Sequence, residues 1–184
     1  MYAIAVAVDV KEILYSTIDS IGKEKIRMEV SAEIERSERY CNEILDRCKS
    51  MLNNSLDHES LAVLCEALLH FMLTASVLPS ERKVNWKGSQ LDLVVPSLKM
   101  LSSSPEKSLV IQIIKRNAEL TKIKYANSVQ PHHANIWIVS AKRVDVAHKN
   151  YCIESNELPY SRIILDINAF LLRTGDRGLK LLHG

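Results

Sequence analysis

Glycine and proline are both scarce in this 184-residue sequence, with five of each. No Gly-rich loop of the kind that cradles phosphates in P-loop ATPases, or that opens a dinucleotide-binding βαβ unit, is present. No nucleophile elbow of the α/β-hydrolase type occurs either. The sequence therefore gives no support to a nucleotide-driven motor, a Rossmann dehydrogenase or a serine hydrolase of that type.

Paired cysteines are also lacking, because the four cysteines form no C-x-x-C motif. Cysteines in a reducing compartment stay free, so we expect no disulfide framework. Cys41 and Cys48 are seven residues apart on one face of a predicted helix, which indicates core packing.

Long hydrophobic runs are missing as well. The N-terminal stretch MYAIAVAVDV is apolar only as far as Asp9 and has no basic segment before it, so it predicts neither a signal peptide nor a membrane span. We therefore expect a cytoplasmic protein with no membrane partner. The chain has few glutamines and many Ile, Leu, Lys and Glu residues, a composition compatible with a thermophile.

An excess of charge of either sign is absent, since the net charge is +2 and the pI is about 8.3. Charge alone therefore does not identify a nucleic-acid-binding protein. The composition is 47% hydrophobic and 25% charged, as in an ordered globular protein with a substantial core. The basic residues lean toward the C-terminal half.

The first 56 residues are predicted to form a helical extension that could serve as an oligomerisation arm. Residues 2–8 alternate as in a strand, residues 10–21 follow a helical period ended by Gly22, and the segment KIRMEV (25–30) alternates like an edge strand. Residues 31–53 then show one apolar stripe, which predicts a long amphipathic helix. An exposed helix of this kind fits a dimer or partner interface, so we expect a homodimer.

Residues 57–184 are predicted to form an α/β domain. An almost wholly apolar helix capped by Asp57 runs to Pro79, and three strands follow in ERKVNW, LDLVV and SLVIQIIKR. A helix from Asn117 to Pro131, the strand ANIWIVS and a strand plus short helix in RIILDINAFLLR complete the chain. The expected fold is a mixed central sheet flanked by helices, with an α-β-β-β-α-β core.

Asp92 lies in the middle of the apolar strand LDLVV. Its neighbours are apolar on both faces, which indicates a central strand and a carboxylate that needs a partner. We expect that partner to be Lys115, although a solvent-facing carboxylate at a strand end is the alternative. Glu66 lies on the preceding helix in a narrow polar stripe, where it could instead pair with His70 four residues later.

This order of elements, with Glu66 on the helix, Asp92 in the second strand and Lys115 at the end of the third, resembles the PD-(D/E)XK, or restriction-endonuclease-like, nuclease superfamily. The resemblance covers roughly residues 57–140. It implies that Asp92, Lys115 and Glu66 form a catalytic site in which Asp92 and Glu66 bind Mg²⁺. Such a cation neutralises charge on the phosphate and activates water, which a lysine orients.

The sequence departs from the superfamily pattern at Ile113, which stands two residues before Lys115, where a second strand acid is expected. Strand alternation puts Ile113 and Lys115 on one face and Gln112 on the other, so Gln112 could share the site only across a bulge. Glu66, or Glu119 at the start of the next helix, could replace the missing acid. Without such a replacement, the site would bind Mg²⁺ poorly.

Two functions are consistent with these observations. In the first, the chain is a nucleic-acid-associated protein on a nuclease-like scaffold, with weakened or lost phosphodiesterase activity on DNA or RNA. Its phosphate contacts are then predicted to come from five basic residues: Arg116, Lys122, Lys124, Lys142 and Arg143. In the second, the same sheet supports a non-catalytic assembly or protein-interaction module.

Overall fold

The computed structural model describes residues 9–52, 56–155 and 157–175. Its centre is a five-stranded sheet in the order β1-β2-β3-β4-β5. The strands are β1 (Glu81–Trp86), β2 (Ser89–Val95), β3 (Leu109–Ile114), β4 (Ile136–Ser140) and β5 (Lys149–Cys152). The pairs β1/β2 and β2/β3 are antiparallel, whereas β3/β4 and β4/β5 are parallel. The expected mixed α/β sheet is confirmed.

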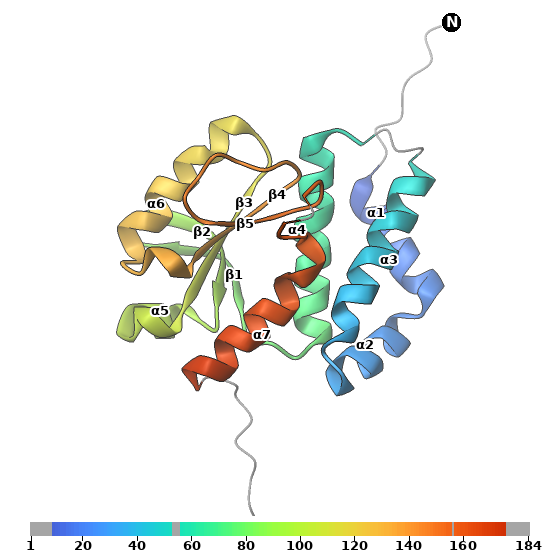
Figure 1. The fold of residues 1–184 in the computed structure, drawn as a ribbon, viewed down its shortest axis with the longest axis horizontal. Coiled ribbons are helices and arrows are strands. Elements are labelled where there is room, and N and C mark those ends of the chain that lie inside the picture. Colours follow the sequence, from blue (N-terminus) through green and yellow to red (C-terminus); the bar gives the residue numbers. More distant parts are fainter. Residues whose placement is uncertain (1–8, 53–55, 156, 176–184) are drawn as a thin grey trace, which may run out of the picture.

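Each face of the sheet has its own hydrophobic core. On one face, α5 (Leu98–Ser103) and α6 (Thr121–Val129) cover residues such as Val110 and Ile138. On the other face, α4 (His58–Ala75) and α7 (Ile163–Thr174) cover residues such as Ile111 and Val139. Figure 1 shows the sheet between these two helix pairs.

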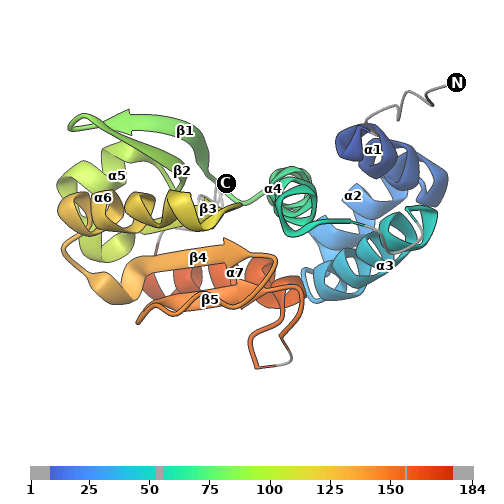
Figure 2. The same ribbon diagram turned by 90° about the horizontal axis from the view of Figure 1, so that it is seen from above.

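The N-terminal helices pack against the outer side of α4 (Figure 2). They are α1 (Val10–Ile21), α2 (Lys23–Ala32) and α3 (Arg36–Met51). The buried face of α3, including Tyr40, Ile44 and Cys48, belongs to the same core as α4 and α7. Cys41 and Cys48 are buried free thiols, as the sequence predicts. The predicted division into residues 1–56 and 57–184 stays a prediction.

Helix starts follow the polar residues that the sequence marks. Asp9 and Asp57 cap α1 and α4 by accepting hydrogen bonds from the backbone amides of Lys11 and Ser60. Gly22 ends α1 with a φ of 105°, a backbone conformation that favours glycine. The helix predicted to begin at Asn117 starts instead with a 3₁₀ turn (Asn117–Leu120), and α6 follows it.

Three sequence predictions are wrong. The segment KIRMEV belongs to α2, because Ile26 and Val30 are four residues apart and both are buried. The predicted helix over 31–53 begins only at Arg36, since α2 extends to Ala32. RIILDINAFLLR is helical throughout, and the last strand is Lys149–Cys152, a short polar segment without a clear strand pattern. The predicted strand over residues 2–8 lies outside the described residues.

A buried hydrogen bond joins the segment that precedes α7 to α4, and its contribution to stability can be measured. The Tyr160 hydroxyl donates a hydrogen bond of 2.7 Å to the Cys65 carbonyl on α4, and the Tyr160 side chain is fully buried. Tyr160→Phe should lower the free energy of unfolding by about 1 kcal/mol, because one buried hydrogen bond is lost without a cavity. Urea unfolding measures this effect. Tyr125→Phe, at an exposed tyrosine, is the control and should have no measurable effect.

Candidate functional site

The candidate site forms where β2 and β3 separate. The paired register between these strands ends at Leu93 and Ile111, although both strands continue beyond this pair. Side chains bridge the gap: Asp92 Oδ2 accepts from the Ile113 amide at 2.9 Å, and Gln112 Oε1 accepts from the Asp92 amide at 3.0 Å. The side chains of Asp92 and Gln112 thus replace the backbone partners that the parted strands lack.

A tight hairpin brings Lys83 to the same place. The strands β1 and β2 pair from Trp86 and Ser89 outward, so the loop consists of Lys87 and Gly88, both with positive φ. This register places Lys83 opposite Asp92. Lys83 Nζ lies 2.8 Å from Asp92 Oδ1 and 2.7 Å from Glu66 Oε1 on α4.

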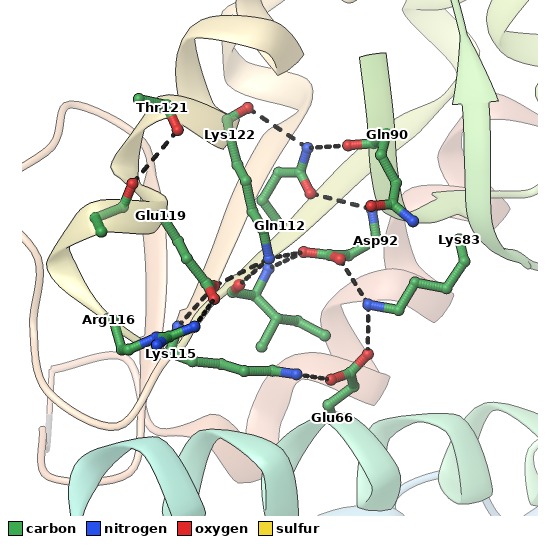
Figure 3. Close-up of polar contacts among 12 residues, drawn as sticks. Glu66, Lys83, Gln90, Asp92, Gln112, Lys115, Arg116, Glu119, Thr121 and Lys122 are labelled. Carbon is green, nitrogen blue, oxygen red and sulfur yellow. Dashed lines mark hydrogen bonds and ion pairs between the residues drawn. The ribbon is translucent and has the colours of Figure 1, made fainter. Parts of the chain in front are cut away.

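Two more lysines complete the cluster (Figure 3). Lys115 Nζ lies 2.7 Å from Glu66 Oε2. Lys122, on α6, lies 3.1 Å from Asp92 Oδ2 and 3.0 Å from Glu119 Oε2. Each carboxylate of this cluster therefore contacts at least one lysine. We call Glu66, Asp92, Glu119, Lys83, Lys115 and Lys122 the acid–lysine cluster.

The electrostatics of Glu66 and Lys83 keep both residues charged. His70, whose Nε2 lies 4.0 Å from Glu66 Oε1, holds the pKa of Glu66 well below its usual range, and Lys115 and Lys83 add to this effect. Partial burial alone would raise that pKa. Burial also acts to lower the pKa of Lys83, but its hydrogen bonds to Asp92 and Glu66 outweigh this effect and raise the pKa.

The structure brings together the three predicted catalytic residues, but in different pairs. Asp92 is buried in a central strand, as expected, yet its lysine partners are Lys83 and Lys122, so the predicted pair with Lys115 is wrong. Lys115 contacts Glu66 instead, because β3 alternation turns it toward α4. The predicted Glu66–His70 approach exists, although 4.0 Å exceeds hydrogen-bond length.

Gln112 and Glu119 have structural roles at this site. Gln112 is fully buried beneath α6 on the opposite face from Ile113, so no bulge brings it to Lys115. Glu119 accepts a hydrogen bond of 3.2 Å from the Lys115 amide.

Lys83 is the residue that the sequence reasoning missed. The available signal was the two-residue hairpin loop Lys87-Gly88. Once that turn is recognised, counting residues outward from it along both strands places Lys83 opposite Asp92.

A basic cavity of about 450 Å³ adjoins the cluster at the carboxyl ends of β3 and β4. Its lining includes Lys115, Arg116, Lys142 and Arg143, together with His58. Three of the five predicted phosphate-contacting residues therefore line one cavity. The other two do not, since Lys122 points into the acid–lysine cluster and Lys124 is exposed on α6.

The acid–lysine cluster fits a divalent cation poorly. Within the described ranges, no three His, Cys, Asp or Glu side chains are arranged to hold a metal ion. The oxygens of Asp92 and Glu66 that face each other contact the same ammonium group. Mg²⁺ requires near-octahedral oxygen ligands at about 2.0–2.1 Å, and three lysines already balance three carboxylates here. In this arrangement, the carboxylates of Asp92 and Glu66 are occupied by lysines and are not free to bind Mg²⁺.

Comparison with solved structures identifies the fold. Metal-depleted Ecl18kI bound to uncleaved, modified DNA matches with a TM-score of 0.61 and 10% identity, over 90% of this chain and 80% of that one. The restriction endonuclease PspGI in complex with substrate DNA matches with a TM-score of 0.60 and 13% identity, over 91% and 94% of the two chains. The chain has the restriction-endonuclease-like fold.

No protein-family model matches the sequence, and no curated protein matches it. At these low identities, the similarity concerns the backbone arrangement alone, and the chemistry of this chain depends on its own residues. Among the described helices, none has the length and apolar character needed to cross a membrane.

The burial of Asp92 predicts a strong effect of neutralising it. Asp92→Asn should lower the free energy of unfolding by about 3 kcal/mol, because two lysines lose a buried partner and an amide nitrogen could face the Ile113 donor. Chemical unfolding measures the loss. Glu59→Gln is the control: its 3.6 Å contact with Arg116 is exposed, so it should change stability by less than about 0.5 kcal/mol. Equal effects of both variants would contradict the structural role of Asp92.

The depressed pKa of Glu66 predicts a pH dependence. An acid with a lowered folded-state pKa stabilises the fold above its unfolded-state pKa, which is near the ordinary value of 4.5, and loses this contribution as the pH falls. The stability difference between the wild type and Glu66→Gln should therefore be largest near pH 6 and shrink below about pH 4.5. Urea unfolding of both proteins from pH 6 to 3 tests this, and a constant difference would contradict it.

Proposed function

We propose that this protein binds nucleic acid, with DNA as the first candidate, through the basic cavity at the carboxyl ends of β3 and β4. The observation that carries the proposal is the gathering of Lys115, Arg116, Lys142 and Arg143 around that cavity. Basic side chains along a groove attract the phosphate backbone whatever its sequence. The two solved structures of the same fold contain DNA, which supports DNA as the partner.

Phosphodiesterase activity at the neighbouring acid–lysine cluster is expected to be weak or lost. Ile113 stands at the strand position of the second acid and is fully buried in the core. The remaining acids are already paired with lysines. In an active protein of this fold, Asp92, Glu66 and Lys115 would be the catalytic residues and Mg²⁺ the cofactor.

The predicted homodimer remains part of this proposal. The apolar face of α3 packs inside the chain against α1, α4 and α7, so it is not available as the interface that the sequence suggested. A dimer would therefore use another surface. The alternative function, a non-catalytic assembly module, requires no nucleic-acid binding at all.

Salt-dependent binding tests the basic cavity. Replacing both Arg116 and Lys142 with alanine should weaken binding to a DNA duplex and reduce the slope of log K against log salt by about 1.8, if each contacts one phosphate. Fluorescence anisotropy at several salt concentrations measures both quantities. The matched control replaces the exposed Lys99 and Lys107, at the opposite end of the sheet, and should leave the slope unchanged. Equal losses for both double variants would contradict a defined binding cavity.

Cleavage assays separate a scaffold from an active nuclease. We expect little or no cleavage of labelled single- and double-stranded DNA or RNA with Mg²⁺ or Mn²⁺, compared with a chelator control. Efficient metal-dependent cleavage that disappears in a folded Asp92→Ala variant would overturn the proposed loss of activity. Cleavage that persists in Asp92→Ala would not come from this site. Absence of both cleavage and salt-sensitive binding would favour the assembly module.

A further inference from the structure

Lys83 has a different position from the other two lysines of the acid–lysine cluster. Its Nζ lies 2.8 Å from Asp92 Oδ1 and 2.7 Å from Glu66 Oε1, so one ammonium group bridges two carboxylates from different elements (Figure 3). Within the described part of the chain, Lys115 contacts Glu66 and Lys122 contacts Asp92, but neither contacts both. Lys83 therefore lies where a cation shared by Asp92 and Glu66 would bind.

The backbone at Lys83 is held in an unusual conformation. Its φ is 51°, in the left-handed region, although it lies in the middle of β1. For a residue with a β-carbon this conformation costs about 1–2 kcal/mol, so the surrounding structure must impose it. The paired residues on either side, Arg82 with Leu93 and Val84 with Leu91, fix the strand around it. The Lys83 side chain thus reaches the cluster from a constrained backbone.

Both carboxylates are largely buried, and each shares Lys83 in addition to a lysine of its own, Lys115 for Glu66 and Lys122 for Asp92. The Asp92 side chain is 3% exposed and that of Glu66 is 13% exposed, so solvent contributes little to neutralising them. Buried carboxylates need a cation or hydrogen-bond donors. A divalent cation and a lysine would compete for the same facing oxygens, Asp92 Oδ1 and Glu66 Oε1.

We propose that Lys83 is a built-in counterion that occupies the place of a divalent cation between Asp92 and Glu66, and that it prevents Mg²⁺ or Mn²⁺ from binding there. Removal of this single ammonium group then exposes two carboxylate oxygens of suitable chemistry to an incoming cation. This inference deepens the proposed loss of metal-dependent activity and rests on it, but it concerns cation binding alone. It predicts a gain of metal affinity from the loss of one lysine.

The experiment measures Mn²⁺ binding without DNA. Isothermal titration calorimetry and Mn²⁺ electron paramagnetic resonance are applied to the wild type, Lys83→Met and Lys83→Gln. Both neutral variants should bind Mn²⁺ at least about tenfold more tightly than the wild type, since a like charge a few ångström away no longer opposes the ion. Lys83→Arg keeps the positive charge and should show no gain. Lys99→Met removes an exposed lysine from α5 and should show no gain either.

The location of the bound ion is tested separately. Adding Asp92→Asn to Lys83→Gln should abolish the gained affinity, provided that circular dichroism shows a folded protein. Paramagnetic broadening by Mn²⁺ should reach the Ile113 amide, which donates to Asp92, in Lys83→Gln but not in the wild type. Wild-type broadening at Ile113 at the same Mn²⁺ concentration would overturn the proposal, even if no variant folds. Unchanged affinity in a folded Lys83→Met or Lys83→Gln variant would overturn it too.

Failure of this inference and failure of the proposed function give different results. Gained Mn²⁺ affinity without salt-sensitive DNA binding would support the role of Lys83 and contradict the nucleic-acid proposal. DNA binding through Arg116 and Lys142 without any gain on replacing Lys83 would support the nucleic-acid proposal and contradict the role of Lys83. The two measurements depend on different residues, because Lys83 is not among those lining the basic cavity.

Discussion

The buried carboxylate of Asp92 is the constraint on which this region of the protein depends. It lies where β2 and β3 part, and it accepts a hydrogen bond from the Ile113 amide, beyond the last residues that pair between these two strands. A buried negative charge requires neutralisation, and this explains why lysines from two other elements, Lys83 on β1 and Lys122 on α6, converge on it. Asp92 thus contacts residues of β1, β3 and α6 at the place where β2 and β3 separate.

The same arrangement separates two electrostatic environments at one end of the sheet. Inside, three carboxylates and three lysines compensate one another, so the acid–lysine cluster has no net charge to attract an ion. Outside, Arg116, Lys142 and Arg143 line a cavity whose lining, among the described residues, includes no acidic side chain. Because Lys115 contributes to both, the neutral cluster and the basic surface are adjacent. Phosphate attraction and metal binding act together in a metal-dependent nuclease. In the proposed function, phosphate attraction depends on the basic cavity, whereas metal binding would depend on Asp92 and Glu66.

The sequence predicts much of the sheet because its strands are marked by local patterns. ERKVNW and LDLVV become strands in full, and ANIWIVS does so from Ile136. Parity along β3 correctly places Lys115 and Ile113 on the face toward α4. Contacts between residues far apart in the sequence are harder to predict from local patterns. Pairing Lys83 with Asp92 depends on the hairpin register, and the contact of Lys122 with Asp92 depends on how α6 packs. Residues 149–152 form a strand because they pair with β4. Their sequence shows no strand pattern, and only Tyr151 and Cys152 are buried.

The presence of Ile113, where the resemblance predicts an acid, and the position of Lys83 are connected by charge balance. A divalent cation compensates two carboxylates, and it is well suited to a site in which two strand acids and a helix acid converge. Ile113 is fully buried and packs in the core beneath α4, which leaves Asp92 as the strand acid facing Glu66. Three lysines match the three carboxylates of the acid–lysine cluster, so a metal ion would add positive charge to a cluster that is already balanced. The strained backbone of Lys83 is consistent with this account, because its cost is offset by the two carboxylate contacts that the side chain makes.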